Sequence, residues 1–393
     1  MLKKYNSCSL FEKMATSIAR KLCSSSVNVG QQLKLNCFKL CIRREQHNLT
    51  PARFFTTPAI KYRTGTKSRA ALLVSGTLSF ALLGINFGKK DEEAVDPLTQ
   101  KYRDARLAHM RQDLKEADNL YHECLKLASH LVEAKDITEE KFLTARILMY
   151  DGLADIAMQT GQIETAEALY KDTMKGCLQQ GMDINHNTIV EISLKLASIY
   201  AIIGKKQEAE AGYLFCIQTQ TPKLKTKMKQ AKDAGIRPDL DEQEKDTAAL
   251  LGMALGSYGR FLLYEKRYTE ALPMFKQACA YADYILGPKS NQYIVVLNDL
   301  ATLYIVTNRL SEAEQLLEEG IMLSNNFDLA EGAALYCNLG AVHLRKGKIP
   351  EATKTCQLAL EFAKKFDHKM AYQMAESCLK KCESLKSGKP TEE

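Results

Sequence analysis

The residues with the most reactive side chains do not combine into a known catalytic pattern. Gly252, Gly256 and Gly259 lack the Lys-Ser/Thr pair that completes a phosphate-binding loop, so their predicted role is close helix packing. The seven histidines form neither HExxH nor a Cys/His cluster, and a structural role is predicted for His109 and His122. No GxSxG nucleophile motif occurs in the sequence. We therefore predict a protein that is not an enzyme and that holds no metal ion or other cofactor.

The twelve cysteines contain no CxxC pair and no close disulfide spacing, so most are predicted to be small apolar core residues. Cys378 and Cys382 lie four residues apart on one predicted helix face. A metal ion or a partner cysteine is the alternative to core packing there. Cys337 and Cys356, on the two helices of the last predicted hairpin, are predicted to be separate core thiols, with a disulfide between them as the alternative.

Charge is divided unevenly along the chain. The formal net charge is +7, but residues 1–69 carry 14 Lys/Arg against two Glu, a local balance of +12. Residues 70–393 therefore hold 40 basic and 45 acidic side chains, a balance of −5. The basic excess belongs to the N-terminal segment, which indicates targeting and argues against nucleic-acid binding.

Residues 1–55 have the features of a mitochondrial transit peptide: few acidic residues, several Arg and Ser, and an amphipathic helical pattern. The apolar residues on one predicted helix face are Leu10, Phe11, Met14, Ile18 and Leu22. Arg53 stands where a matrix peptidase expects an arginine two or three residues before its cut. Cleavage is therefore predicted after Phe54 or Phe55.

A single membrane span is predicted over residues 70–88, which contain no charged residue. Nineteen helical residues extend about 28 Å, close to the thickness of a bilayer core. Residues 56–69 are basic and are predicted to stay on the matrix side, whereas the linker at 89–97 turns acidic after two lysines. This asymmetry predicts an inner-membrane protein whose C-terminal part faces the intermembrane space. The alternative is a buried helix of the soluble domain.

One pattern recurs over residues 98–386: a small residue is followed four positions later by an aromatic or apolar one. The pairs are Ala117/Tyr121, Ala166/Tyr170, Ala209/Tyr213, Ala271/Phe275, Ala313/Leu317 and Ala352/Cys356. In most units a large-small pair, such as Leu153-Ala154, precedes them by twelve or thirteen residues. Small side chains at a crossing allow two helices to approach closely, and such hairpins bury their apolar faces only by stacking. We therefore predict an all-α solenoid of about six hairpins, a capping helix at 370–385 and a disordered tail at 387–393.

This pattern resembles the tetratricopeptide repeat family, with a large-small pair on the first helix and alanine, aromatic and small positions on the second. Intervals between the anchor alanines are 49, 43, 62, 42 and 39 residues, longer than the family's 34. The intervals near 42 resemble repeats of the kinesin-light-chain type. The 62-residue interval contains a charged insert at about 218–245, predicted to extend one helix and add a solvated loop, with partner binding as the alternative.

Residues 189–201 and 211–217, together with the presequence and the span, resemble a mitochondrial branch of this family. That resemblance implies an assembly or maintenance factor of respiratory complex III (cytochrome bc1), acting around incorporation or turnover of the Rieske iron–sulfur subunit. It implies complex III subunits as partners, and neither nucleic acid nor a small-molecule substrate. The residues alone leave two alternatives open: an adaptor for mitochondrial protein import and an adaptor for a mitochondrial protease.

In this family the first helices of the hairpins line a concave groove, so the resemblance implies candidate partner-binding positions. These are Asp151, Asp155, Gln159, Ser198, Arg260, Tyr264, Asn298, Thr302, Asn338, Ala341 and Arg345. The alternative role for the same residues is simple solvation. They do not reproduce the Lys/Asn/Lys/Arg clamp by which some members hold a C-terminal carboxylate, which disfavours an adaptor for chaperone tails.

Overall fold

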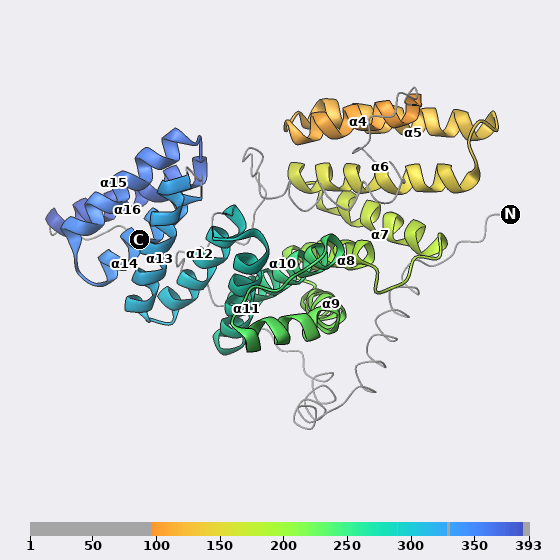
Figure 1. Ribbon diagram of the computed structural model, residues 1–393. Helices are drawn as coiled ribbons and strands as arrows, with labels where there is room; N and C mark the ends of the chain where they lie inside the picture. The colour runs from red at the N-terminus through yellow and green to blue at the C-terminus, as the bar shows by residue number, and fades with distance from the viewer. Residues whose placement is uncertain (1–95, 289, 328–330, 388–393) are drawn as a thin grey trace, which may run out of the picture. The chain divides into compact units, whose positions relative to one another are not determined.

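The computed structural model describes residues 96–288, 290–327 and 331–387, and every regular element in these ranges is an α-helix (Figure 1). The predicted transit peptide, the cleavage positions Phe54 and Phe55, and the predicted span at 70–88 lie outside the described residues. Among the helices that are described, none is long and apolar enough to cross a membrane.

The described helices pair into six consecutive hairpins followed by a single helix, which confirms the predicted all-α repeat fold. The hairpins are α4 (Pro97–Met110) with α5 (Leu114–Glu133), α6 (Glu139–Thr160) with α7 (Ile163–Gln179), α8 (Asn187–Ile202) with α9 (Lys206–Ala234), α10 (Glu242–Tyr264) with α11 (Tyr268–Leu286), α12 (Asn291–Val306) with α13 (Leu310–Phe327), and α14 (Gly332–Arg345) with α15 (Ile349–Lys365). Helix α16 (Lys369–Ser387) follows the sixth hairpin. Each helix packs against its neighbours in the chain, and most first helices also contact the first helix of the next hairpin. This is the stacking that a repeat array needs to build a continuous core.

The turns inside the six hairpins share one backbone feature, a residue with a positive φ angle. In each turn, a residue one or two positions after the end of the first helix adopts a positive φ, which ends the helix and reverses the chain. The six residues are Gln112, Gly161, Gly204, Lys266, Asn308 and Gly347, with φ between 59° and 80°. Glycine and asparagine favour this conformation and mark the turn in the sequence, whereas Gln112 and Lys266 carry no such signal.

The core is built where small residues meet large ones. All six anchor alanines of the repeat pattern are fully buried, and so are the aromatic residues that follow them. Tyr121 of the first hairpin lies over Gly152 of α6, where an added Cβ would be 2.5 Å from the Tyr121 Cζ. Phe275 lies in the same way against Gly259, within the fourth hairpin. The predicted close helix packing of Gly259 is therefore confirmed.

Residues 218–245 form the second half of α9, a short loop and the start of α10. This segment contributes to the core, because Leu224 and Leu240 are buried in a cluster with Leu251 and Leu255 of α10. Asp241 begins α10 with a capping box, in which its side chain accepts from the Glu244 backbone and Glu244 accepts from the Asp241 backbone. The segment thus has a packed side as well as a charged one.

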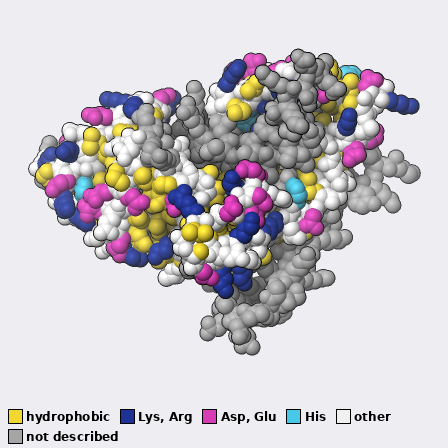
Figure 2. All heavy atoms as spheres, viewed as in Figure 1, with side chains coloured by type: hydrophobic (Ala, Val, Ile, Leu, Met, Phe, Trp, Pro, Cys, Tyr) yellow, Lys and Arg dark blue, Asp and Glu magenta, His cyan; other side chains and the backbone are white. Residues whose placement is uncertain are grey.

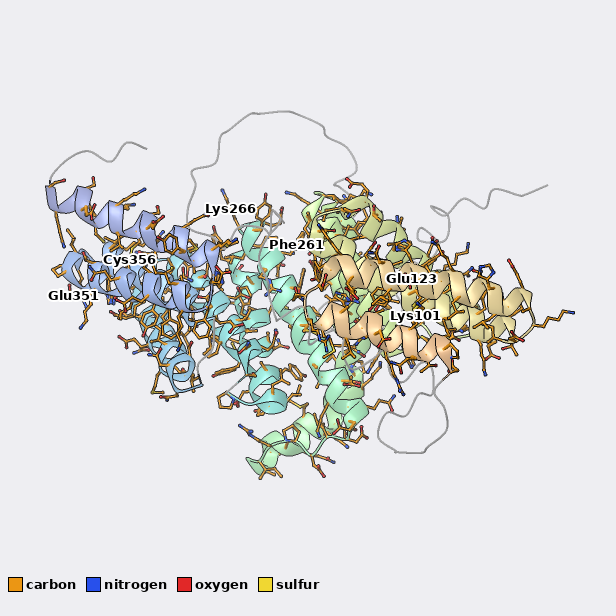
Figure 3. All side chains as sticks on the ribbon, turned by 90° about the horizontal axis from the view of Figure 1, so that it is seen from above. Lys101, Glu123, Phe261, Lys266, Glu351 and Cys356 are labelled. Atoms are coloured by element: carbon orange, nitrogen blue, oxygen red, sulfur yellow. A yellow bond between two sulfur atoms is a disulfide. The ribbon has the colours of Figure 1, made fainter. Side chains whose placement is uncertain are left out.

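Cysteine pairing differs from the sequence prediction. Cys356 of α15 forms a disulfide with Cys378 of α16, and their Cα atoms are 6.2 Å apart (Figure 3). Cys337 is a free buried thiol close to the Ala371 carbonyl oxygen, so Cys337 and Cys356 do not form a disulfide with each other. Cys382 is also buried and free. The prediction that Cys356 is a separate thiol is wrong, because α16 packs beside α15 and brings Cys378 to it.

We predict that Gly152→Ala lowers stability. The added methyl would overlap the Tyr121 ring, which is fully buried, and overpacking of this kind costs about 1–3 kcal/mol. Gly256→Ala is the matched control: its nearest contacts would be at 4.0 Å, so the gain in helix propensity leaves it neutral or more stable. Denaturant unfolding of both variants measures the difference. Equal free energies of unfolding would contradict the packing described here.

Candidate protein-binding face of the first helices

All of the candidate groove residues lie on first helices, along one stripe of each. On α6 they are spaced four residues apart, at Asp151, Asp155 and Gln159. This spacing places side chains on one helix face. The structure divides the candidates into residues that contact one another across hairpins and residues that remain exposed to solvent.

A largely buried cluster of charged residues joins α6 to α8. Lys195 Nζ lies 3.0 Å from Asp151 Oδ1, 3.0 Å from Asp155 Oδ1 and 3.2 Å from Glu191 Oε1. The Tyr170 hydroxyl donates a hydrogen bond to Asp155. Lys195 and Glu191 were not among the sequence candidates. The i, i+4 spacing of Glu191 and Lys195 within an apolar helix is the one signal in the sequence that points to them.

Burial sets the electrostatics of this cluster. It raises the pKa of Glu191 to about 7, although Lys195 acts in the opposite direction. Burial likewise raises the pKa of Asp151. Burial also disfavours the Lys195 ammonium, but Asp151, Asp155 and Glu191 together hold its pKa well above the ordinary value. The lysine therefore stays charged and neutralises part of the carboxylate charge.

Two further candidates make contacts between elements. Gln159 Nε2 lies 2.9 Å from Nε2 of His109 on α4, and burial lowers the pKa of this histidine. Ser198 on α8 accepts a 3.4 Å hydrogen bond from the Tyr213 hydroxyl of α9 and donates one to the Leu194 carbonyl oxygen. Both candidates thus have partners inside the array.

In the C-terminal hairpins, three candidates are buried together. Asn338 Nδ2 donates to Asn298 Oδ1 at 2.7 Å and approaches Thr302 Oγ1 at 3.3 Å. The Thr302 hydroxyl donates to the Asn298 carbonyl oxygen at 2.8 Å. All three residues are buried, so this network connects α12 to α14 and is not open to a partner. These hydrogen bonds offset the cost of burying the polar groups.

The exposed candidates lie on α10 and α14. Tyr264 has 63% of its surface exposed. Arg260 is partly exposed and donates to Asp299 Oδ2 on α12 at 2.8 Å. Arg345 is exposed, and its Nη1 donates to the Ile305 carbonyl oxygen. Ala341 is half-buried on the same stripe of α14. Exposed aromatic and arginine side chains are enriched at protein interfaces.

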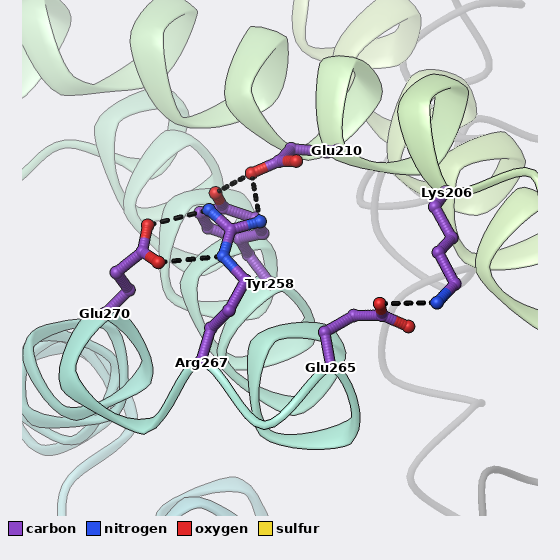
Figure 4. Close-up of polar contacts among 6 residues, drawn as sticks. All are labelled: Lys206, Glu210, Tyr258, Glu265, Arg267 and Glu270. Carbon is purple, nitrogen blue, oxygen red and sulfur yellow. Dashed lines mark hydrogen bonds and ion pairs between the residues drawn. The ribbon is translucent and has the colours of Figure 1, made fainter. Parts of the chain in front are cut away.

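A second polar junction fixes the third hairpin against the fourth, at the turn between α10 and α11 (Figure 4). Arg267 donates to Glu210 of α9 and to Glu270 of α11, each at 2.7 Å. Glu210 also accepts from the Tyr258 hydroxyl at 2.7 Å. These contacts hold the hairpin turn of α10 and α11 against α9.

Comparison with known proteins identifies the class of the chain. The family model of the tetratricopeptide repeat matches residues 248–323. The structure is also similar to that of a Rap protein complexed with competence and sporulation factor, with a TM-score of 0.51 and 11% identity, covering 82% of this chain and 88% of that one. This structural similarity supports the fold alone. The chain is thus a tetratricopeptide repeat protein.

Comparison with related proteins identifies a particular family within this class. Human tetratricopeptide repeat protein 19, mitochondrial, is 34% identical over 273 residues, which cover 70% of this chain and 68% of the relative. The mitochondrial homologue of the same protein in Drosophila melanogaster is 26% identical over 306 residues, 77% of either chain. The chain therefore belongs to the tetratricopeptide repeat protein 19 family, which confirms the resemblance inferred from the sequence.

We predict that Lys195→Met destabilises the array, because it leaves three largely buried carboxyl groups without their cation. Removing one member of a buried ion pair costs about 3–5 kcal/mol. Lys171→Met is the control: it removes a partly exposed 2.6 Å ion pair with Glu167, and such pairs contribute less than about 1 kcal/mol. Chemical denaturation of both variants gives the two costs. If Lys195→Met lowers the free energy of unfolding no more than Lys171→Met does, the cluster has no central role in stability.

We also predict a pH dependence that originates at Glu191. Its pKa rises from an ordinary 4.5 to about 7 in the fold, so the folded protein binds this proton more tightly than the unfolded chain does. The resulting stabilisation is complete below pH 4.5 and is lost as the pH rises through about 7. Glu191→Gln should flatten the fall in melting temperature between pH 5 and 8. An identical slope in the variant and the wild type would show that Glu191 is not the titrating group.

Proposed function

We propose that the protein is a membrane-tethered scaffold that binds other proteins and acts in the assembly or maintenance of respiratory complex III. The observation that carries the proposal is membership of the tetratricopeptide repeat protein 19 family, whose relatives are named as mitochondrial. In this proposal the partners are complex III subunits, including the Rieske iron–sulfur protein.

The exposed part of the first-helix face supports a binding function. Tyr264 offers a large, rigid side chain with a polar tip, and Arg260 and Arg345 offer planar hydrogen-bond donors. Their neighbours on the same face are already paired inside the array. The face therefore offers a partner a fixed arrangement of exposed side chains, which limits the entropy that binding costs.

The predicted N-terminal part completes the proposal. A presequence at 1–55 would direct the chain to mitochondria, and a span at 70–88 would hold the repeat array at the inner membrane, facing the intermembrane space. Tethering confines the binding face to within a few nanometres of the membrane. Its effective concentration near membrane-bound partners rises accordingly.

The test is native purification of the tagged full-length protein from mitochondria, with the double variant Tyr264→Ala/Arg345→Ala beside the wild type. We expect complex III subunits to accompany the wild type and to fall at least about tenfold with the variant, because aromatic and arginine contacts at interfaces contribute about 2 kcal/mol or more each.

Tyr284→Ala is the matched control, since Tyr284 is an exposed tyrosine on the second helix α11. It should leave the yield of complex III subunits unchanged. If the wild type brings down import or protease components without complex III subunits, the proposed partner is wrong. If Tyr284→Ala and the double variant lose partners equally, the proposed face is wrong.

A further inference from the structure

A second surface of the C-terminal hairpins has the properties of a binding site. The second helices α13 and α15 form the walls of a groove with a volume of about 560 Å³, and α14 forms its floor. Apolar side chains line it from all three helices, among them Ile321, Met322, Leu339 and Leu358. Figure 2 shows apolar side chains gathered over these C-terminal helices.

This groove lies on the other side of α14 from the face proposed to bind complex III. Tyr336 and His343 line the groove, whereas Asn338 and Arg345 belong to the first-helix stripe. Tyr336 and Asn338 are two residues apart, and so are His343 and Arg345. Two residues correspond to a rotation of about 200° around a helix of 3.6 residues per turn, so the two pairs lie on opposite sides of α14. Occupation of one surface therefore leaves the other free.

The walls of the groove are held in place before any partner binds. Asn325 Nδ2 of α13 donates a 2.9 Å hydrogen bond to the Tyr336 hydroxyl. On the opposite wall, the rings of Tyr336 and Phe362 have centroids 5.4 Å apart. Tyr336 thus links both walls to the floor. A preformed groove of this kind binds at a lower entropic cost than one that must open first.

One apolar side chain in the groove is left open to water. Met322 has 57% of its surface exposed, whereas Ile321 beside it is buried. Methionine is adaptable and polarisable, and it is common at surfaces that accept a partner's apolar side chain. Covering Met322 and the half-buried Leu358 would remove apolar area from water.

The end of the groove near His343 is acidic. Glu318 of α13 and Glu351 of α15 line it from opposite walls, and neither forms an ion pair with a residue that the structure describes (Figure 3 labels Glu351). Burial lowers the pKa of His343, so this histidine does not supply a compensating charge at neutral pH. Lys354 also lines the groove, one turn beyond Glu351 on α15. The groove lining therefore carries two carboxylates against one ammonium group, an excess of negative charge that is complementary to a basic side chain.

We propose that the groove between α13 and α15 binds an amphipathic helix of a partner protein, which lays apolar side chains on Met322 and Leu358 and places a Lys or Arg between Glu318 and Glu351. A helix fits a groove between two helices by presenting apolar residues at i, i+3 and i+4. The two carboxylates select a basic partner and repel an acidic one.

A charge-swap experiment tests this site. The probes are two fluorescent 18-residue helical peptides with the same leucine stripe, one flanked by Lys and the other by Glu. Fluorescence anisotropy measures their binding to the purified full-length protein in mild detergent. We expect the basic peptide to bind at least about tenfold more tightly than the acidic one, and Glu318→Lys/Glu351→Lys to reverse this preference.

Glu361→Lys supplies the control, because Glu361 is exposed on α15 and does not line the groove. It should preserve the preference for the basic peptide, as should Tyr264→Ala/Arg345→Ala on the first-helix face. Met322→Asp should weaken binding of the basic peptide, with an unchanged melting temperature. The proposal would be overturned if neither peptide bound or if both bound equally. It would also be overturned if Glu318→Lys/Glu351→Lys left the preference for the basic peptide unchanged. None of these outcomes depends on complex III binding, so the two proposals fail independently.

Discussion

The constraint on which the structure depends is that no single hairpin can bury its own apolar side. Each hairpin needs the next one, and the small residues at the helix crossings decide how close that neighbour comes. Gly152 under Tyr121 and Gly340 against the sulfur atoms of Cys356 and Cys378 show how little space remains at two of these crossings. Because every hairpin is oriented by its neighbour, the first helices present equivalent stripes along the array.

Polar contacts fix the stacking of these hairpins more specifically than apolar packing does. Lys195 connects α8 to two carboxylates on α6, and Asn338 connects α14 to Asn298 on α12. A buried polar group that loses its partner is costly, so such contacts disfavour a shifted register between hairpins. Residues that form these contacts are no longer available to bind a partner. What remains for a partner are the exposed side chains of Arg260, Tyr264 and Arg345.

Much of the fold could be predicted from the sequence, because the repeat pattern is local: an alanine followed four residues later by an aromatic or apolar residue marks each second helix. The turns were recognisable where glycine or asparagine supplies the positive φ, and not at Lys266. The site was less predictable. Asp151 and Lys195 are 44 residues apart and meet only through stacking, and Asn298 and Asn338 satisfy each other for the same reason. The Cys356–Cys378 disulfide likewise depends on where α16 packs.

The proposed function requires the exposed first-helix face to contact a subunit of complex III. Site-specific photo-crosslinking in intact mitochondria tests it most directly, with a photoreactive amino acid at position 264 and, for comparison, at position 284. We expect a crosslink from position 264 to a complex III subunit, the Rieske protein among the candidates, and none from position 284. Crosslinks from position 264 that reach only import or protease components, or no protein at all, would contradict it.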